Sequence, residues 1–239
     1  MVLAPEILQK GNHFMEKTSL ITNPKVTGYL NRFYSPESQE LMELRIGAEE
    51  AQIPIILRET EDFLNVLLSI LQPERILEIG TAVGYSAAYF AKKTGAHVIT
   101  IEKSEEMFRI AEENVKKLGL EDSIRLLPGD GEEEIKKLAE AGEKPFDFLF
   151  IDAAKSHYKR FLDAAMPLTH PGSVIVSDNV LFRGSVAEDE EHLDRRHKTN
   201  IRRLQEYMEY IYHHPALETS LIACGDGLAI SRVREKNQI

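Results

Sequence analysis

The stretch RILEIGTAVGYSAAYFAKK, residues 75–93, changes character in its middle. Its first six residues predict a β-strand, and its last nine predict a helix. Gly80 and Gly84 lie in the turn between them, where glycine lets the backbone pass close to a ligand. The stretch therefore predicts a strand–turn–helix unit with a binding turn, which is the repeating element of an open parallel sheet.

Strands and helices continue to alternate after this unit. Strands are predicted at 75–80, 97–102, 123–130, 146–152 and 172–179, with a helix between each consecutive pair. Two further strands are expected on either side of Gly225-Asp226-Gly227, as an antiparallel pair. Strands that alternate with helices form a parallel sheet that is covered on both faces. The sequence therefore predicts an α/β fold with a seven-stranded, mostly parallel sheet.

The residues before this alternation are predicted to be helical, with Thr60 as the N-cap of one helix. The apolar stripe of that helix is predicted from four residues at helical spacing: Phe63, Val66, Leu67 and Ile70. No internal repeat, low-complexity tract or linker divides the sequence. We therefore expect a single domain over residues 1–239, made of an N-terminal helical cap (1–72) and a core (73–239).

The composition is that of an ordinary globular protein. The chain has 239 residues, of which 43% are hydrophobic and 28% charged, and its net charge is −10. This charge argues against broad, nonspecific attraction to nucleic acid or acidic membranes. No apolar stretch approaches the roughly 20 residues that span a bilayer, and the N-terminus does not resemble a signal peptide. Cys224 is the only cysteine, so we expect a cytoplasmic protein without membrane contact.

The turn after the first strand has the pattern E-x-G-x-x-x-G over residues 78–84. Ala82 occupies the place where the dinucleotide fingerprint G-x-G-x-x-G needs a glycine, which disfavours NAD. The sequence also lacks G-x-x-x-x-G-K-[ST], which excludes a P-loop. On its own, the pattern is equally compatible with a tight strand–helix turn that binds nothing.

Acidic residues at the ends of neighbouring strands make the turn more informative. Glu102, which ends the second strand, can accept hydrogen bonds from both ribose hydroxyls of a nucleoside. Asp130 follows the third strand and is placed to meet the edge of an adenine. Glu78 or Asp152 could hold an amino group. A ligand with a nucleoside, no phosphate and a cationic end fits this set, and S-adenosylmethionine is such a ligand.

Three oxygen-bearing side chains follow the fourth and fifth predicted strands. Asp152 ends one of these strands, and Asp178 with Asn179 ends the other. Two carboxylates held close together repel unless a positive charge lies between them. Mg²⁺ prefers carboxylate, amide and water oxygens, whereas the lack of clustered Cys or H-E-x-x-H argues against zinc. We therefore expect a magnesium site, although each residue alone could simply cap a helix or form a turn.

Lys155 follows Asp152 by three residues and is expected beside the same metal. A substrate hydroxyl bound to the cation would lose its proton more easily. Lys155 could take that proton or stabilise the oxyanion, which would then attack the sulfonium methyl in line. The competing interpretation is an ordinary surface lysine.

At these residues the chain resembles the metal-dependent class I O-methyltransferases, which include catechol and caffeoyl-CoA O-methyltransferases. The resemblance covers roughly residues 40 to 233. The motifs that match in order and spacing are LEIGTAVGYSA, IE at 101–102, GD at 129–130, FIDAAK and SDNV. The resemblance implies a Rossmann-like methyltransferase fold and a homodimer. It also implies that Mg²⁺ is ligated by Asp152, Asp178 and Asn179, and that Lys155 and Asp152 are the catalytic residues. The predicted cofactor-binding set is Ile53, Glu78, Gly80, Thr81, Tyr85, Ser86, Glu102, Gly129, Asp130 and Asp152.

Within that family, IDAAKSHY, SDNVLFRGSVAED and GDGLAIS look most similar to bacterial tRNA 5-hydroxyuridine methyltransferases. This branch implies methylation of 5-hydroxyuridine at the wobble position of the anticodon loop, to give 5-methoxyuridine. The alternatives are an O-methyltransferase of small catechols or related phenols, and a noncatalytic S-adenosylmethionine-binding module. A local basic patch would serve a tRNA acceptor, and its predicted residues are Arg183, Arg195, Arg196 and Arg202.

Overall fold

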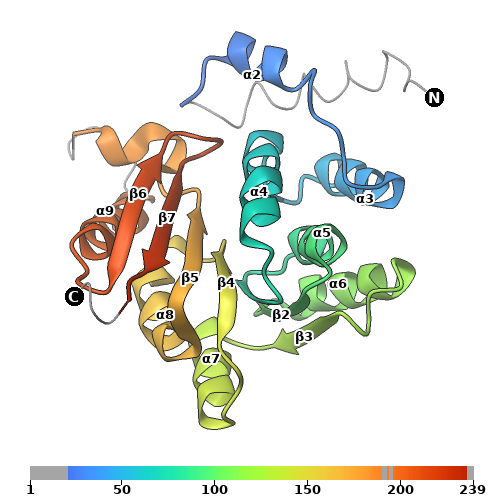
Figure 1. The fold of residues 1–239 in the computed structure, drawn as a ribbon. Helices are drawn as coiled ribbons and strands as arrows, with labels where there is room; N and C mark the ends of the chain where they lie inside the picture. The colour runs from blue at the N-terminus through green and yellow to red at the C-terminus, as the bar shows by residue number, and fades with distance from the viewer. Residues whose placement is uncertain (1–20, 190–192, 194–195, 236–239) are drawn as a thin grey trace.

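A seven-stranded sheet forms the centre of the protein, in the order β3-β2-β1-β4-β5-β7-β6 (Figure 1). The structure, a computed structural model, describes residues 21–189, 193 and 196–235. The strands are β1 (Arg75–Ile79), β2 (His97–Glu102), β3 (Ile124–Pro128), β4 (Phe146–Ile151), β5 (Thr169–Asp178), β6 (Leu217–Ile222) and β7 (Leu228–Val233). Strands β1 to β5 pair in parallel, and β7 pairs antiparallel with β5 and β6. The predicted α/β fold with its Rossmann-like sheet is therefore confirmed.

Helices cover both faces of the sheet (Figure 1). Phe148 and Phe150 of β4 belong to a core cluster with α3, α4, α5 and α6, while Leu149 and Ile151 belong to a second cluster with α7, α8 and α9. Alternate residues of one strand thus enter opposite cores, which explains why the strand sequence is apolar almost throughout. The helices are α2 (Pro24–Leu30), α3 (Gln39–Glu50), α4 (Arg58–Leu71), α5 (Tyr85–Thr94), α6 (Glu105–Lys117), α7 (Gly131–Glu140), α8 (Tyr158–Ala165) and α9 (Lys198–Tyr212).

The strand order determines where a ligand can bind. The chain runs outward through β1, β2 and β3, then returns to place β4 on the other side of β1. The carboxyl ends of these parallel strands meet at one edge, where the order reverses and a crevice opens. Because β7 is antiparallel, its first residue, Leu228, lies opposite Asp178 at the end of β5. The last hairpin therefore reaches the same edge as the ends of β4 and β5.

The predicted N-cap of α4 is wrong. The helix begins at Arg58, so its N-cap is Leu57, which makes no side-chain capping hydrogen bond. Thr60 lies in the first turn instead and is fully buried, with no hydrogen-bond partner for its hydroxyl among the described residues. Tertiary packing begins this helix earlier than its capping signal indicates, because Arg58 and Thr60 are both needed in its buried face.

The predicted apolar stripe of α4 is also wrong in part. Val66 and Ile70 are 61% and 74% exposed, whereas Leu64 and Leu68 are buried against the core. Two apolar stripes lie side by side on this helix, and periodicity alone does not say which of them meets the sheet. The helical prediction for residues 1–20 lies outside the described residues. No helix in the described ranges is long and apolar enough to cross a membrane.

Candidate active site

Gly80 brings the end of β1 into direct contact with the end of β4. Its φ of +99° is a conformation that favours glycine, and a Cβ added there would lie 2.0 Å from the carbonyl oxygen of Asp152. Gly84, the N-cap of α5, also has a positive φ, and its added Cβ would lie 3.4 Å from the Ala111 side chain. The first glycine is therefore required by backbone packing at the edge where both strands end.

Glu102 holds the glycine turn in place. Its Oε2 accepts hydrogen bonds from the backbone N–H groups of Thr81, at 3.2 Å, and Ala82, at 2.8 Å. Its Oε1 accepts one from Ser104 N–H at 2.8 Å. The sequence predicts that Glu102 binds ribose hydroxyls, but it does not reveal this second role in holding the turn. Among the described residues, Oε1 accepts only the hydrogen bond from Ser104 and has a further lone pair, so the carboxylate can still accept from a ligand.

Asp130 caps α7 at the neighbouring strand end. Its Oδ1 accepts a hydrogen bond from Glu132 N–H at 3.1 Å, and its Oδ2 accepts one from Lys103 Nζ at 3.0 Å. The hydrogen bond from Lys103 is the main reason that the pKa of Asp130 is lowered. Gly129, before it, donates its N–H to the carbonyl of Glu102 at 2.8 Å. Both predicted residues thus lie at the joined ends of β2 and β3.

Glu78 is a fully buried carboxyl group with one unused oxygen. Its Oε2 accepts a hydrogen bond from the Thr100 hydroxyl at 2.5 Å, and its Oε1 has no partner among the described residues. Burial raises the pKa of Glu78 to about 7, partly offset by the nearby hydroxyl groups of Ser86 and Thr100. A buried acceptor without a partner costs free energy. The site therefore fits a ligand with an amino group, as S-adenosylmethionine has.

Lys155 joins the oxygens that the sequence assigned to a metal. Its Nζ lies 2.8 Å from Asp152 Oδ1 and 2.9 Å from Asn179 Oδ1. Burial would by itself lower the pKa of Lys155, but the Asp152 carboxylate and Tyr158 raise it above its usual range. Tyr158, which the sequence analysis missed, is buried and donates its hydroxyl to the carbonyl of Asp178 at 2.8 Å. Its spacing of three residues from Lys155 was the available signal.

Asp178 completes this group. Its Oδ1 accepts the N–H of Asn179 at 2.7 Å, and its Oδ2 is buried without a partner among the described residues. Burial and the neighbouring Asp152 carboxylate raise the pKa of Asp178. Asn179 has a φ of +56°, which asparagine tolerates better than most residues. The predicted convergence of Asp152, Asp178 and Asn179 at one sheet edge is what the structure shows.

These oxygens fit a hard divalent cation. Asp152 and Asn179 oxygens already surround one positive charge, and the Asp178 carboxylate, which has one oxygen unpartnered among the described residues, interacts electrostatically with Asp152 and Lys155. Mg²⁺ takes such carboxylate and amide donors. Within the described ranges no cluster of three or more His, Cys, Asp or Glu could hold a metal. The proposed metal ligands therefore include the amide of Asn179 as the third donor. Metal binding by these three residues remains a prediction.

A pocket of about 440 Å³ adjoins this group, a size typical of small-molecule sites. One wall is apolar and comes from the extended segment 53–57, between α3 and α4. Arg183 and Asp226 line the pocket on the side of η3 (Phe182–Ala187) and the β6–β7 turn. Six predicted cofactor residues also line it: Ile53, Gly80, Thr81, Tyr85, Ser86 and Asp152.

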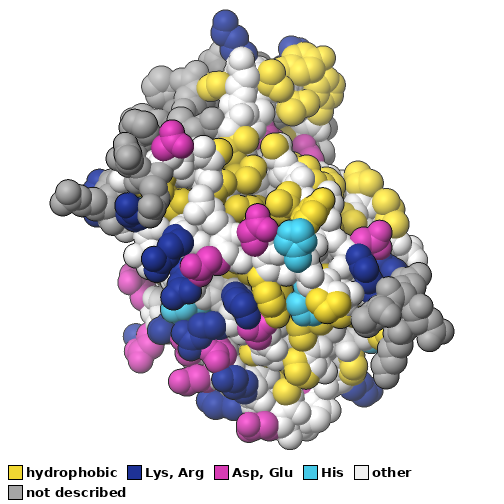
Figure 2. Space-filling model, turned by 90° about the vertical axis from the view of Figure 1, so that its left-hand side faces the viewer, with side chains coloured by type: hydrophobic (Ala, Val, Ile, Leu, Met, Phe, Trp, Pro, Cys, Tyr) yellow, Lys and Arg dark blue, Asp and Glu magenta, His cyan; other side chains and the backbone are white. Residues whose placement is uncertain are grey.

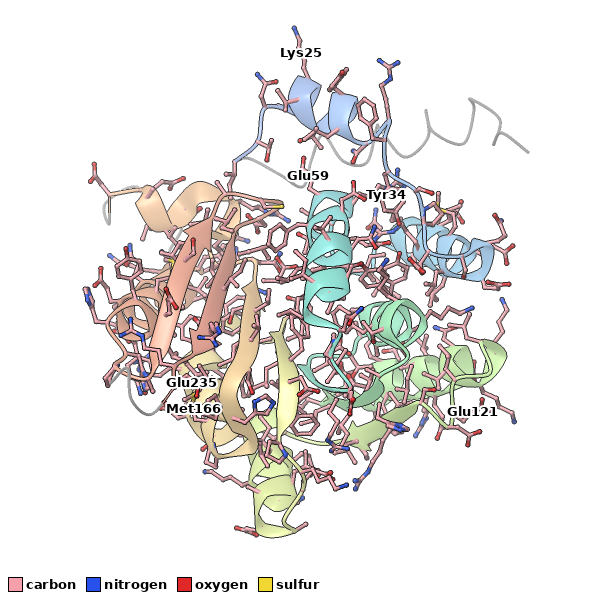
Figure 3. The ribbon with its side chains drawn as sticks, viewed as in Figure 1. Lys25, Tyr34, Glu59, Glu121, Met166 and Glu235 are labelled. Carbon is pink, nitrogen blue, oxygen red and sulfur yellow. The ribbon has the colours of Figure 1, made fainter. Side chains whose placement is uncertain are left out.

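A buried ionic network, which the sequence analysis missed, lies under the pocket. Arg45 is 1% exposed and forms an ion pair with Glu61, which is 2% exposed. Tyr85 donates its hydroxyl to Glu61 at 2.7 Å, and Tyr34 donates to the same carboxylate at 2.9 Å. Figure 3 shows Tyr34 between the α2 segment and α3. The network therefore ties the N-terminal segment to the first residue of α5, and nothing local in the sequence indicates it.

The four predicted nucleic-acid arginines do not form one described patch. Arg183 lines the pocket, while Arg202 on α9 pairs with Glu206 at 3.7 Å. Arg196 is exposed, and Arg195 lies outside the described residues. On the face shown in Figure 2, Lys and Arg side chains are interspersed with Asp and Glu. Among these arginines, Arg183 is therefore the one that the structure connects to the candidate active site.

A family model described as O-methyltransferase matches residues 33–234. The chain belongs to the O-methyltransferase family. A catechol O-methyltransferase from Niastella koreensis is 32% identical over 69% of this chain and 76% of the relative. A catechol O-methyltransferase from Mycobacterium tuberculosis is 28% identical over 88% of this chain and 96% of the relative.

Solved structures of O-methyltransferases have the same fold. A candidate caffeoyl-CoA O-methyltransferase from Staphylococcus aureus superposes with a TM-score of 0.80 at 32% identity, covering 87% of this chain and 98% of the other. The Bacillus cereus O-methyltransferase, solved with S-adenosylhomocysteine, has a TM-score of 0.77 at 26% identity, covering 92% and 100%. This O-methyltransferase is therefore an S-adenosylmethionine-dependent enzyme.

Proposed function

We propose that this O-methyltransferase uses S-adenosylmethionine and Mg²⁺ to methylate a small catechol-type phenol. The observation that carries the proposal is the gathering of the Asp152 and Asn179 oxygens around one cationic position, with the unpartnered Asp178 oxygen beside them. The apolar wall at 53–57 suits an aromatic ring in the same pocket. The named activities of the catechol O-methyltransferase relatives agree with such an acceptor.

The residues at the ends of β4 and β5 have two proposed roles, which are to hold the reactants and to stabilise charge. Asp152, Asp178 and Asn179 would hold Mg²⁺, which when bound supplies a Lewis acid that lowers the pKa of the acceptor hydroxyl. Lys155 keeps its proton at neutral pH in this environment, which favours stabilising negative charge on the acceptor oxygen over acting as a base. The pocket aligns that oxygen with the methyl group and excludes water.

Separate residues would bind the cofactor. Glu78 offers its free Oε1 to the amino group of S-adenosylmethionine, and Glu102 offers the remaining lone pair of its Oε1 to the ribose hydroxyls. Asp130 meets the adenine edge, at the expense of part of its hydrogen bonding to Lys103. The glycine turn between these carboxylates already has the conformation that Glu102 imposes, so binding requires little rearrangement there.

A tRNA acceptor is the second candidate. The sequence motifs ranked it first, but the named relatives are catechol, flavonoid and caffeoyl-CoA O-methyltransferases, so we reverse that order. The observation that still favours it is the cationic side chain of Arg183 in the pocket, within the motif SDNVLFRGSVAED. Interspersed charges on the face in Figure 2 weaken it, because RNA binding requires a basic surface.

One assay distinguishes the candidates. The enzyme is incubated with labelled S-adenosylmethionine and either catechol or tRNA that carries 5-hydroxyuridine, with Mg²⁺ or with EDTA. We expect transfer to catechol with Mg²⁺ and its loss with EDTA. Transfer to tRNA alone would replace the first candidate with the second, and activity unaffected by EDTA would remove the metal.

Two variants locate the metal. Asp178→Ala is expected to abolish turnover and heat of Mg²⁺ binding in calorimetry, whereas Asp122→Ala, at an exposed position in the turn between α6 and β3, should change neither. Full activity and unchanged Mg²⁺ binding in Asp178→Ala would exclude Asp178 as a ligand.

We also propose a homodimer in the cytoplasm. The exposed apolar side chains of Val66 and Ile70 on α4 support self-association, since exposed apolar patches mark interaction sites. The lone Cys224 suits a reducing compartment. Light scattering coupled to size exclusion should give twice the mass of 27.1 kDa, and Ile70→Glu should give the monomer. Cell fractionation tests the compartment.

A further inference from the structure

Arg183 is held on the pocket wall by its backbone. Its φ of +57° lies in the left-handed region, which an arginine adopts at a cost. The backbone N–H of Arg183 donates to Asp226 Oδ1 at 2.5 Å, and Leu181 N–H donates to the Asp226 carbonyl at 3.1 Å. Gly227 packs so closely on Leu181 that an added Cβ would lie 2.3 Å from it. The turn thus fixes the point from which the Arg183 side chain leaves the backbone.

Arg183 is exposed and lines the pocket, and its guanidinium has no hydrogen bond or ion pair within the described part of the chain. Asp226 is close enough to interact electrostatically but forms no ion pair with it. By contrast, the other pocket arginine, Arg45, is fully engaged with Glu61 and the carbonyl of Ile56. Arg183 therefore presents an available positive charge to whatever occupies the pocket.

The pocket constrains which ligand group can meet that charge. Lys155 and its carboxylate and amide partners occupy one part of the lining, the apolar segment 53–57 a second, and Arg183 a third. An acceptor whose hydroxyl lies beside Lys155 and whose ring lies on the apolar wall has its remaining substituent available for Arg183. Guanidinium binds carboxylates in a planar, bidentate geometry, and such charge-assisted bonds are stronger than hydrogen bonds between neutral groups.

We propose that Arg183 is a specificity-determining residue that selects phenolic acceptors carrying a carboxylate remote from the reacting hydroxyl. The proposal rests on the small-phenol function above and names its substrate class, an acidic catechol. The left-handed backbone supports it, because glycine or asparagine would satisfy this turn with less strain and would offer no charge. Asp226 contributes by holding the arginine backbone rather than by neutralising its side chain.

The test compares acids with their neutral isosteres. Values of kcat/KM are measured for 3,4-dihydroxybenzoate, 3-(3,4-dihydroxyphenyl)propanoate, the amide of each, and catechol. We expect the wild-type enzyme to prefer at least one acid over its own amide by roughly 30-fold, the scale of a hydrogen-bonded charge pair. If the enzyme prefers neither acid over its amide, the proposal is overturned. Turnover of catechol in that case would still support the small-phenol function.

Variants assign the preference to its residue. Arg183→Gln is expected to reduce the acid-to-amide ratio of kcat/KM to near one, and Arg183→Lys to retain part of it. Arg203→Gln, on the exposed face of α9 and paired with Glu206 at 2.7 Å, is the matched control and should retain the whole preference. A preference that survives Arg183→Gln would remove the residue from this role.

Two further outcomes are distinguishable. If the enzyme methylates 5-hydroxyuridine tRNA and no phenol, the small-phenol function is wrong, and the proposal for Arg183 is wrong as well. If Arg183→Gln is unstable, the acid-to-amide comparison in the wild-type enzyme still decides whether a carboxylate is selected. Binding of S-adenosylhomocysteine, measured by calorimetry, shows that each variant retains its cofactor site.

Discussion

The ammonium nitrogen of Lys155 lies 2.8 Å from Oδ1 of Asp152, and it also contacts the side-chain oxygen of Asn179. A carboxylate at the end of a buried strand is thus neutralised by a lysine that follows it by three residues. The same oxygens are the proposed metal ligands, so Lys155 and a divalent cation would share one group of donors. This arrangement places the charge that would stabilise an acceptor oxyanion beside the cation.

We expect Lys155→Met to reduce kcat with a catechol by roughly 100- to 1,000-fold, because it removes the positive charge beside the acceptor oxygen. Binding of S-adenosylhomocysteine should change by less than a few-fold in calorimetry. Lys159→Met is the control, since Lys159 lies on the exposed side of α8 and pairs with Asp163 at 2.7 Å. Near wild-type kcat in Lys155→Met would contradict a catalytic role.

Glu78→Gln should stabilise the cofactor-free protein at high pH. The pKa of Glu78 rises from 4.5 in the unfolded chain to about 7 in the folded protein. Below pH 4.5 both states are protonated and the carboxyl imposes no penalty, but the penalty grows up to pH 7 and then remains constant. Its full size is roughly 3 kcal/mol.

Urea unfolding at pH 8 and at pH 3.5 measures this effect. The variant is expected to be more stable than the wild-type protein at pH 8 and equal to it at the lower pH. At the same time Glu78→Gln should weaken S-adenosylmethionine binding, because the charge that meets the amino group is lost. Equal stability of the two proteins at both pH values would show that burial does not raise the pKa of Glu78 in the folded protein.

Gly80→Ala should destabilise the protein strongly, because its Cβ would lie 2.0 Å from the backbone oxygen of Asp152. Gly95→Ala provides a matched comparison. Gly95 also has a positive φ, of +72°, but no atom lies within 4 Å of its added Cβ. The control should lose about 1 kcal/mol from its conformation alone, and Gly80→Ala at least twice that. Thermal unfolding of both variants checks the difference, and equal losses would contradict the close strand contact.

Arg45→Met should cost about 3–5 kcal/mol, because it leaves the Glu61 carboxylate buried without its partner. The double variant Arg45→Met/Glu61→Leu should be more stable than Arg45→Met alone, since no buried charge remains. Lys92→Met, which breaks a surface pair with Glu40 at 3.4 Å, should cost less than about 1 kcal/mol. Denaturant titration of the wild type, Arg45→Met, Glu61→Leu and the double variant measures the coupling between Arg45 and Glu61, and additive losses would exclude it.

The sheet was predictable because its strands have two strong signals. Buried parallel strands are apolar along their length, and each is followed by a helix with recognisable ends. Ser104, for example, is a residue type typical of an N-cap, and it caps α6 by accepting the N–H of Met107. The donors at the strand ends were predictable for the same reason, since topology alone brings the ends of β4 and β5 to one edge.

What the sequence did not predict depends on contacts between distant segments. Arg45 and Glu61 lie on different helices, and only the folded packing of α3 against α4 makes them partners. The choice of buried stripe on α4 likewise depends on how this helix lies on the core. Arg183 was expected in a basic patch with other arginines, because charge counting does not reveal that a left-handed turn directs this residue to the pocket.

The antiparallel placement of β7 has a consequence for biosynthesis. Because this strand lies between β5 and β6, Asp226 and Gly227 reach the end of β5 only after the last hairpin has formed. A nascent chain that has emerged from the ribosome only as far as β5 can assemble the glycine turn but lacks the support for Arg183 and its neighbours. The Arg183 side of the site therefore depends on the last hairpin, whereas the glycine turn on the cofactor side does not.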